Sequence, residues 1–217
     1  MAAAPLPRVA AVGEIRAVFW DFGGVILTSP FEAFNEYERA HGLPADFIRS
    51  VNAADPDDNA WARVERQEIT AEEFDVAFAE ESERRGHRVP GADVLALLGG
   101  AVRPDMVEAL DRVIDAGLVT ACLTNNVAGD PRLDVADVME RFHYVVESSK
   151  VGCRKPEPAF YEHACAVAEV APDQVVFLDD LGINLKPAKA MGMATIKVLS
   201  AHQALADLEA VIGIPLL

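Results

Sequence analysis

Cysteine is scarce in this chain: Cys122, Cys153 and Cys165 are the only three among 217 residues. Their number is odd, they are widely separated, and no Cys-x-x-Cys pair or His at zinc-ligand spacing accompanies them. These features exclude a disulfide framework and a zinc-finger pattern. The sequence therefore predicts free thiols in a reducing compartment, and we expect a cytoplasmic protein.

Long apolar runs are also missing. The longest stretch without Asp, Glu, Lys or Arg covers residues 116–129 and contains Thr-Asn-Asn, so it is too short and too polar to cross a bilayer. Residues 1–13 are rich in Ala and Pro but lack a basic region followed by an apolar one. They are predicted to be a flexible leader rather than a signal peptide. No membrane partner is expected.

Positive charge is in short supply. Lys and Arg number 19 against 35 Asp and Glu, which gives a net charge of −16 and a pI of about 4.6. Such a chain repels nucleic acid unless a local basic patch exists, and no such cluster occurs, so nucleic-acid binding is not expected. The hydrophobic share of 51% and the charged share of 25% are those of an ordinary globular protein with a sizeable core.

Short apolar runs alternate with helical patterns over most of the chain. Strands are predicted at residues 17–20, 118–123, 143–146, 175–178 and 194–198. Helices are predicted around 106–114, 160–168 and 205–212. This alternation predicts an α/β fold, with a three-layer, Rossmann-like parallel sheet as its core.

Residues 31–102 differ from the rest because they contain helical patterns and no convincing strand. Helices are predicted at 31–41, 44–51, 60–67 and 70–85, the last opened by a Thr70-x-x-Glu73 capping box. The segment holds 16 acidic and 7 basic residues, all of the latter Arg. It is predicted to be an all-helical domain inserted after the first strand. The α/β core domain would then comprise 14–30 and 103–217.

Polar motifs follow four of the predicted strands. They are Asp21 with Gly23-Gly24, Thr124-Asn125, Lys155 before Pro156, and Asp179-Asp180. Taken singly, the first two also suit caps or turns, and a lone Lys is usually solvated. The adjacent carboxylates repel each other, which favours a shared hard cation such as Mg²⁺. In parallel sheets ligands bind at the carboxyl ends of the strands, so the four motifs are expected to converge.

In this order the motifs resemble the haloacid dehalogenase superfamily of hydrolases, in its subfamily with a helical cap inserted after the first strand. The likeness is greatest to the phosphatase-like N-terminal domains of soluble epoxide hydrolases, through Gly-Cys-Arg-Lys-Pro-Glu-Pro at 152–158 and the long motif at 177–196. The resemblance implies a Mg²⁺-dependent phosphatase in which Asp21 is the nucleophile that accepts the phosphoryl group. The substrate would be a small phosphorylated metabolite and the protein a monomer or homodimer.

The same resemblance implies roles for individual residues. Mg²⁺ would be held by Asp21, Asp179, Asp180 and the main-chain carbonyl of Gly23. Phosphate would be bound by Gly23, Gly24, Thr124, Asn125 and Lys155, with Thr124 and Lys155 also counted as catalytic. Asn184 is expected to cap the helix that runs to Met191 and to orient the acidic loop.

One position departs from the family pattern. The family usually has a second Asp two residues after the nucleophile, where it acts as general acid and base, but this chain has Gly23. Such groups contribute about 10²–10⁴-fold to a rate, so slow turnover is expected unless water, substrate or a cap residue replaces the acid.

Two alternatives remain beside the phosphatase. Gly23 also suits a non-catalytic sensor of a phosphorylated ligand, or an interaction module. A 2-haloacid dehalogenase is a third reading, although those enzymes carry Tyr at this position and need no acidic pair. Within the cap, Trp61, Arg63 and Arg66 share one predicted helix, which either contacts the ligand or forms a solvated face.

Overall fold

The computed structural model describes residues 14–128 and 135–217; the predicted leader at 1–13 lies outside this part of the chain. Five parallel strands form one sheet in the order β3-β2-β1-β4-β5. They are β1 (Ala17–Trp20), β2 (Val119–Thr124), β3 (Tyr144–Glu147), β4 (Val175–Asp179) and β5 (Ala194–Lys197). The predicted α/β fold is confirmed, and each strand lies within one residue of its predicted ends.

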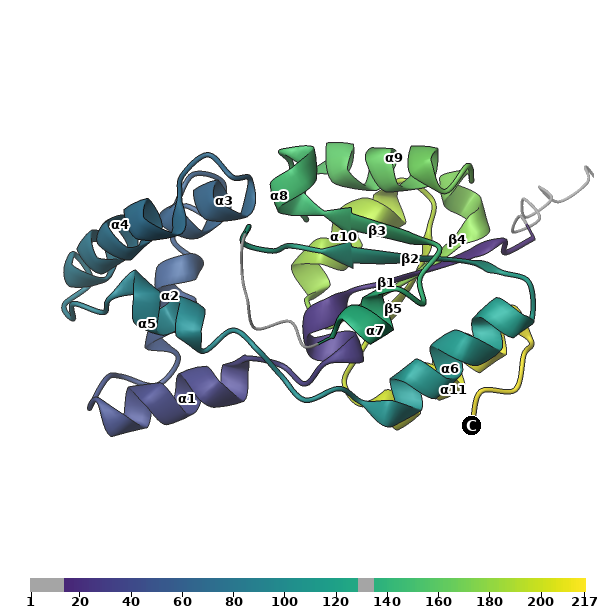
Figure 1. The fold of residues 1–217 in the computed structure, drawn as a ribbon, viewed down its shortest axis with the longest axis horizontal. Helices are drawn as coiled ribbons and strands as arrows, with labels where there is room; N and C mark the ends of the chain where they lie inside the picture. The colour runs from purple at the N-terminus through teal and green to yellow at the C-terminus, as the bar shows by residue number, and fades with distance from the viewer. Residues whose placement is uncertain (1–13, 129–134) are drawn as a thin grey trace, which may run out of the picture.

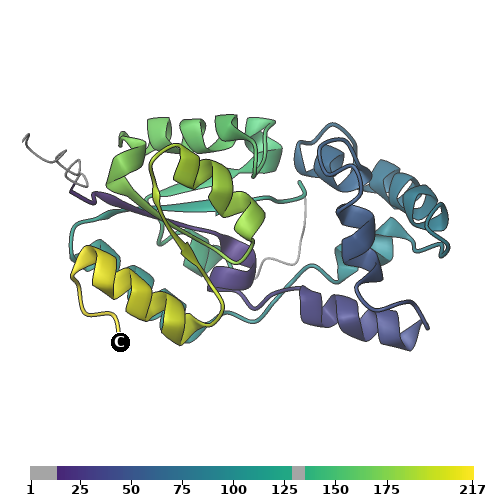
Figure 2. The same ribbon diagram turned by 180° about the vertical axis from the view of Figure 1, so that it is seen from behind.

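Helices cover both faces of the sheet, giving three layers (Figures 1 and 2). Because successive strand residues point to opposite faces, Val18 and Trp20 pack in one apolar core and Ala17 and Phe19 in the other. The first core includes residues of α6 (Pro104–Asp115), α7 (Ala136–Met139) and α11 (Ala201–Ile212). The second includes residues of α9 (Pro158–Val167) and α10 (Gly182–Ala190), while α8 (Ser148–Val151) follows β3. No helix in the described ranges has the length and apolar character needed to cross a membrane.

The segment after β1 is helical, as predicted. It contains α1 (Phe31–Ala40), α2 (Phe47–Asn52), α3 (Ala60–Glu65), α4 (Ala71–Glu83) and α5 (Gly91–Ala96), which lie to one side of the sheet in both views. These helices have an apolar core of their own, with Phe34, Phe74 and Phe78 almost fully buried. The capping box at the start of α4 forms between Thr70 and Glu73.

Two chain segments connect the helical part to the sheet, and they run side by side. Leu27 and Val102 form an antiparallel bridge, and the Thr28 N–H donates to the Ala101 carbonyl at 2.9 Å. The outgoing segment begins with a turn, η1 (Phe22–Ile26), directly after β1, which the Leu27 N–H closes by donating to the Phe22 carbonyl at 2.9 Å. The helical part is therefore tethered close to the carboxyl end of β1.

The strand register brings the predicted motifs to one edge of the sheet. Trp20, the last residue of β1, pairs with Cys122 of β2 on one side and Leu178 of β4 on the other. Asp21 and Asp179 therefore both come directly after this row of paired residues. Thr124 lies one residue further along its strand than the position that matches Asp21. Since β1 is central and the chain crosses over on both sides of it, this edge is the crevice where open α/β sheets bind ligands.

Candidate active site

A buried lysine connects two of the predicted carboxylates. Lys155 is 1% exposed, and its Nζ lies 2.7 Å from Asp21 Oδ1 and 2.9 Å from Asp179 Oδ2. Burial by itself lowers the pKa of Lys155, but the carboxylates of Asp179 and Asp21 outweigh it and raise the pKa above its usual value. Lys155 is therefore charged, and it neutralises part of the negative charge at the strand ends.

Asp21 is held by its own turn as well as by the lysine. Its Oδ1 accepts the main-chain N–H of Phe22 at 2.6 Å in addition to the Lys155 ammonium. Burial raises the pKa of Asp21, and the Lys155 charge opposes that increase. Both described partners bind Oδ1, so Oδ2 is the oxygen left for another ligand or for reaction.

Asp179 is fully buried, and both of its oxygens are occupied. The Leu181 N–H donates to Oδ1 at 2.7 Å, and Asn184 Nδ2 lies 3.1 Å from each oxygen. The prediction that Asn184 caps the following helix is wrong: Leu181 occupies the cap position of α10, and Asn184 is inside the first turn. The Asn184 side chain instead contacts Asp179 in the acidic loop, which agrees with the expectation that it orients this loop.

Asp180 is the half-buried member of the acidic pair. Burial and the neighbouring Asp179 raise its pKa to about 6. Its side chain lies against Gly24, where a Cβ atom would be only 2.2 Å from Asp180 Oδ2. Gly24 also has φ +79°, a left-handed conformation that favours glycine, so both space and backbone require glycine there.

These acids fit a hard divalent cation. One oxygen from each of Asp21, Asp179 and Asp180 lies within 4.8 Å of the others, and three carboxylates exceed the single charge of Lys155. All-oxygen donor sets of this kind suit Mg²⁺. Because Asp179 already accepts several hydrogen bonds, Asp21 and Asp180 have the freer oxygens.

The second predicted motif lies beside the lysine. Thr124 ends β2 and lines the same cavity as Asp21. The Asn125 side chain, expected to bind phosphate, is engaged with protein: its Oδ1 accepts the Lys155 N–H, and its Nδ2 donates to the Lys155 carbonyl, both at 2.9 Å. Nδ2 also lies 3.1 Å from Glu65 Oε2 on α3. In this arrangement Asn125 holds the main chain of Lys155.

Gly23 leaves open space in the site. No atom of the described residues would lie within 4 Å of a Cβ atom there, and the φ and ψ of −68° and 130° are accessible to any residue. Nothing in the local fold therefore excludes a side chain at this position. The site has room for an acid but contains none at residue 23.

A cavity of about 500 Å³ opens between the strand ends and the helical segment. Its apolar lining comes from both parts: Leu27, Pro30, Phe31, Phe34, Ala53, Pro56, Trp61, Leu98, Val127, Met139, Leu181 and Ile183. Trp61 thus lines the cavity, and Arg66, just after α3, forms an ion pair with Glu157 at 3.0 Å. The predicted helix at 60–67 therefore does not only present a solvated face. Arg63 is not among the lining residues.

Among the charged residues of this cavity that sequence reasoning missed are Glu65 and Arg154, which contact each other. Arg154 adjoins Lys155 in a recognised motif, and its Nε donates to Glu65 Oε2. Glu65 stands four residues after Trp61, a spacing that places both on one side of a helix, and Trp61 Nε1 donates to Glu65 Oε1 at 2.8 Å. Spacing alone did not reveal that this side faces the strand ends.

Comparison with known proteins adds independent findings. Residues 15–192 match the family model of the haloacid dehalogenase-like hydrolases. The chain is 32% identical to mouse bifunctional epoxide hydrolase 2 over 92% of its own length, but spans only 39% of that relative. It is 24% identical to the sesquiterpene phosphatase astK of Aspergillus oryzae, covering 91% of this chain and 97% of the relative.

A solved structure has the same fold. A haloacid dehalogenase family enzyme from Bacteroides thetaiotaomicron, in complex with magnesium and inorganic phosphate, superposes with a TM-score of 0.63. The two sequences are 20% identical, and the match covers 89% of this chain and 98% of the other. At this identity the comparison supports the fold.

Proposed function

The chain belongs to the haloacid dehalogenase-like hydrolases, and from this membership we propose that it is a Mg²⁺-dependent phosphatase with Asp21 as nucleophile. The observation that carries the proposal is the buried contact of Lys155 with Asp21 beside Asp179 and Asp180. Moving each of these charged groups out of water costs several kcal/mol of folding free energy. A site that recruits a cation and a phosphate dianion explains why they are gathered there.

The proposed reaction uses two displacements at phosphorus. Asp21 Oδ2 forms a bond to phosphorus as the bond to the ester oxygen breaks, and the leaving oxygen takes up a proton from water and departs as an alcohol. Water then attacks the aspartyl phosphate, gives up a proton to solvent, and releases inorganic phosphate and the free carboxylate. Lys155 keeps Asp21 oriented and offsets negative charge on the transferred group, with the Thr124 hydroxyl as a phosphate-binding donor.

The cation would be held by Asp21, Asp180 and the Gly23 carbonyl, with Asp179 acting directly or by orienting its neighbours. When bound, Mg²⁺ supplies positive charge that reduces the repulsion between the Asp21 carboxylate and the phosphate. Of the residues in this set, Asp180 depends on Gly24 for its position.

We propose residues 31–102 as a cap and 14–30 with 103–217 as the catalytic core. The cap supplies part of the cavity wall, so it would select the leaving group. That wall is mainly apolar, with the buried atoms Asn52 Oδ1 and Arg49 Nε both lacking a hydrogen-bond partner among the described residues. The substrate class that fits is a phosphomonoester with a largely apolar leaving group that carries a donor for Asn52 and an acceptor for Arg49, and the name of the astK relative agrees with an apolar alcohol.

The deciding experiment measures hydrolysis of p-nitrophenyl phosphate with Mg²⁺ and after chelation with EDTA. Turnover that requires Mg²⁺ supports the proposal. Phosphate binding without turnover would instead favour the sensor, which the missing acid at Gly23 motivates. Release of chloride from 2-chloropropionate without metal would favour the dehalogenase, and either result would overturn the phosphatase.

A further inference from the structure

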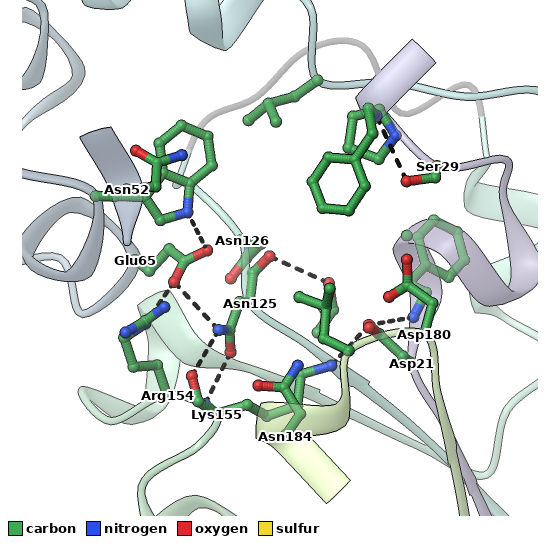
Figure 3. A pocket seen from close by; sticks show the side chains of 18 of the residues that line it. Asp21, Ser29, Asn52, Glu65, Asn125, Asn126, Arg154, Lys155, Asp180 and Asn184 are labelled. Carbon is green, nitrogen blue, oxygen red and sulfur yellow. Dashed lines mark hydrogen bonds and ion pairs between the residues drawn. The ribbon is translucent and has the colours of Figure 1, made fainter. Parts of the chain in front are cut away.

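Glu65 is a buried charged residue of the cap that contacts the catalytic core. It is 6% exposed, and its two oxygens accept hydrogen bonds from three different side chains (Figure 3). Trp61 Nε1 donates to Oε1, whereas Arg154 Nε and Asn125 Nδ2 both donate to Oε2. One donor comes from the cap and two come from the core, so Glu65 joins the two parts at the cavity wall.

The contacts continue from Glu65 to the nucleophile without a break. Asn125 binds both the N–H and the carbonyl of Lys155, each at 2.9 Å. The ammonium of the same lysine contacts Asp21 at 2.7 Å and Asp179 at 2.9 Å. If Glu65 moved, Asn125 Nδ2 would lose one of its two acceptors. The Asn125 side chain would then hold the main chain of Lys155 less firmly.

Other polar contacts keep α3 next to the core at this point. Arg154 Nη1 donates to the carbonyl of Pro56 at 3.2 Å, and Arg66 Nη1 contacts Glu157 Oε1 at 3.0 Å. In the sequence, the cap partners Pro56 and Arg66 stand before and after Glu65. Their core partners, Arg154 and Glu157, stand before and after Lys155. Only Glu65 among these cap residues also reaches Asn125.

We propose that Glu65 is a positioning residue that couples the seated cap to the catalytic lysine. With the cap in place, Glu65 fixes the amide of Asn125, and Asn125 fixes Lys155 against Asp21 and Asp179. This inference rests on the proposed phosphatase function. It adds that full activity requires the cap contact even for a substrate too small to use the cap wall.

The test compares Glu65→Ala with Glu38→Ala. Glu38 is a matched control because it is also a buried cap glutamate, 2% exposed, but it accepts the N–H groups of Asp46 and Ile48 inside the cap and does not line the cavity. Both variants are expected to lower the melting temperature. With p-nitrophenyl phosphate, only Glu65→Ala is expected to lower kcat, by roughly tenfold or more, with a smaller change in KM.

Glu65→Gln provides the rescue, because a glutamine oxygen can still accept from Asn125. It is expected to recover most of the lost kcat. If Glu65→Ala keeps kcat within twofold of wild type, or if Glu38→Ala lowers kcat as much, the positioning role is wrong and Glu65 only stabilises the fold.

A second readout does not depend on turnover. The Lys155 N–H is bonded to Asn125 Oδ1, so its hydrogen exchange, followed by NMR in the full chain, reports the restraint directly. Glu65→Ala is expected to speed this exchange roughly tenfold, and Glu38→Ala to leave it unchanged. An unchanged rate in Glu65→Ala would overturn the inference, whether or not the wild-type protein hydrolyses phosphate esters.

Discussion

The two walls of the cavity are built in different ways. On the core side, charged groups sit at the ends of strands that are hydrogen-bonded on both sides, and Lys155 and Asp179 have almost no exposed surface. On the cap side, the wall consists mainly of apolar side chains on short helices that have a separate core. The core wall can hold reacting atoms to fractions of an ångström, while the apolar side chains of the cap wall, unlike Glu65, can vary in shape without disturbing them.

This difference leads to an expectation about variants. A change on the core wall should alter the rate for every substrate to the same degree, because it acts on the atoms common to all phosphomonoesters. A change of an apolar side chain on the cap wall should alter the order of preference among substrates. The following experiments test this division, beginning with the largest expected effect.

Asp21→Asn removes the proposed nucleophile and should reduce kcat by roughly 10⁴-fold or more for all substrates. Lys155 retains Asp179 as an ionic partner, so the fold should persist, as circular dichroism can verify. Steady-state hydrolysis of p-nitrophenyl phosphate measures the loss. Retention of a tenth of the activity would show that another group attacks phosphorus.

Gly23→Asp adds the acid that the family usually has at this position. The backbone accepts any residue there and the space is open, so the side chain should fit. If protonation of the leaving oxygen limits the wild-type protein, kcat should increase by about 10²–10⁴-fold, most for esters of weakly acidic alcohols. Gly23→Asn is the matched control, since it adds the same bulk without the acid. An unchanged rate in Gly23→Asp would mean that another group already protonates the leaving oxygen.

Gly24→Ala would place a methyl group on the Asp180 carboxylate. The clash, at 2.2 Å, should displace Asp180, weaken Mg²⁺ binding and reduce activity at limiting Mg²⁺ by roughly tenfold. Gly117→Ala is the control, because Gly117 has a similar φ of +83° but, in the described part of the chain, no atom within 4 Å of the added carbon. Both variants bear the backbone cost of about 1–2 kcal/mol. Equal activities at all Mg²⁺ concentrations would argue against a role for Asp180 in binding the metal.

Phe31→Ala tests the cap wall. Phe31 lines the cavity and is only partly buried, so its removal should leave the fold intact. The loss of about 1–1.5 kcal/mol of apolar contact should increase KM about five- to tenfold for 1-naphthyl phosphate, with little change for acetyl phosphate. Val76→Ala, at an exposed position of the cap that does not line the cavity, should change neither. A uniform loss for both substrates would remove the distinction between the two walls.

Much of the core could be predicted from local pattern. Apolar runs such as 17–20 and 175–178 are long enough only for buried strands, and the helices between them force a parallel sheet, so the polar residues that follow the runs must meet at one edge. The structure agrees for Asp21, Thr124 and Asp179. The predicted roles of these residues and of Gly23, Gly24, Asn125, Lys155 and Asp180 remain to be tested by the variants above.

The alternation of strands and helices, the helical insert and the order of the polar motifs can be read from the sequence, because they depend on neighbouring residues along the chain. The contacts of Asn184 with Asp179, of Asn125 with the Lys155 main chain and of Glu65 with Arg154 at the cavity wall emerge only on folding. These contacts join residues from separate elements, and the Glu65 contacts join residues 60 and 89 positions apart in the chain. Such pairings depend on how the helices pack, which no local pattern of residues specifies.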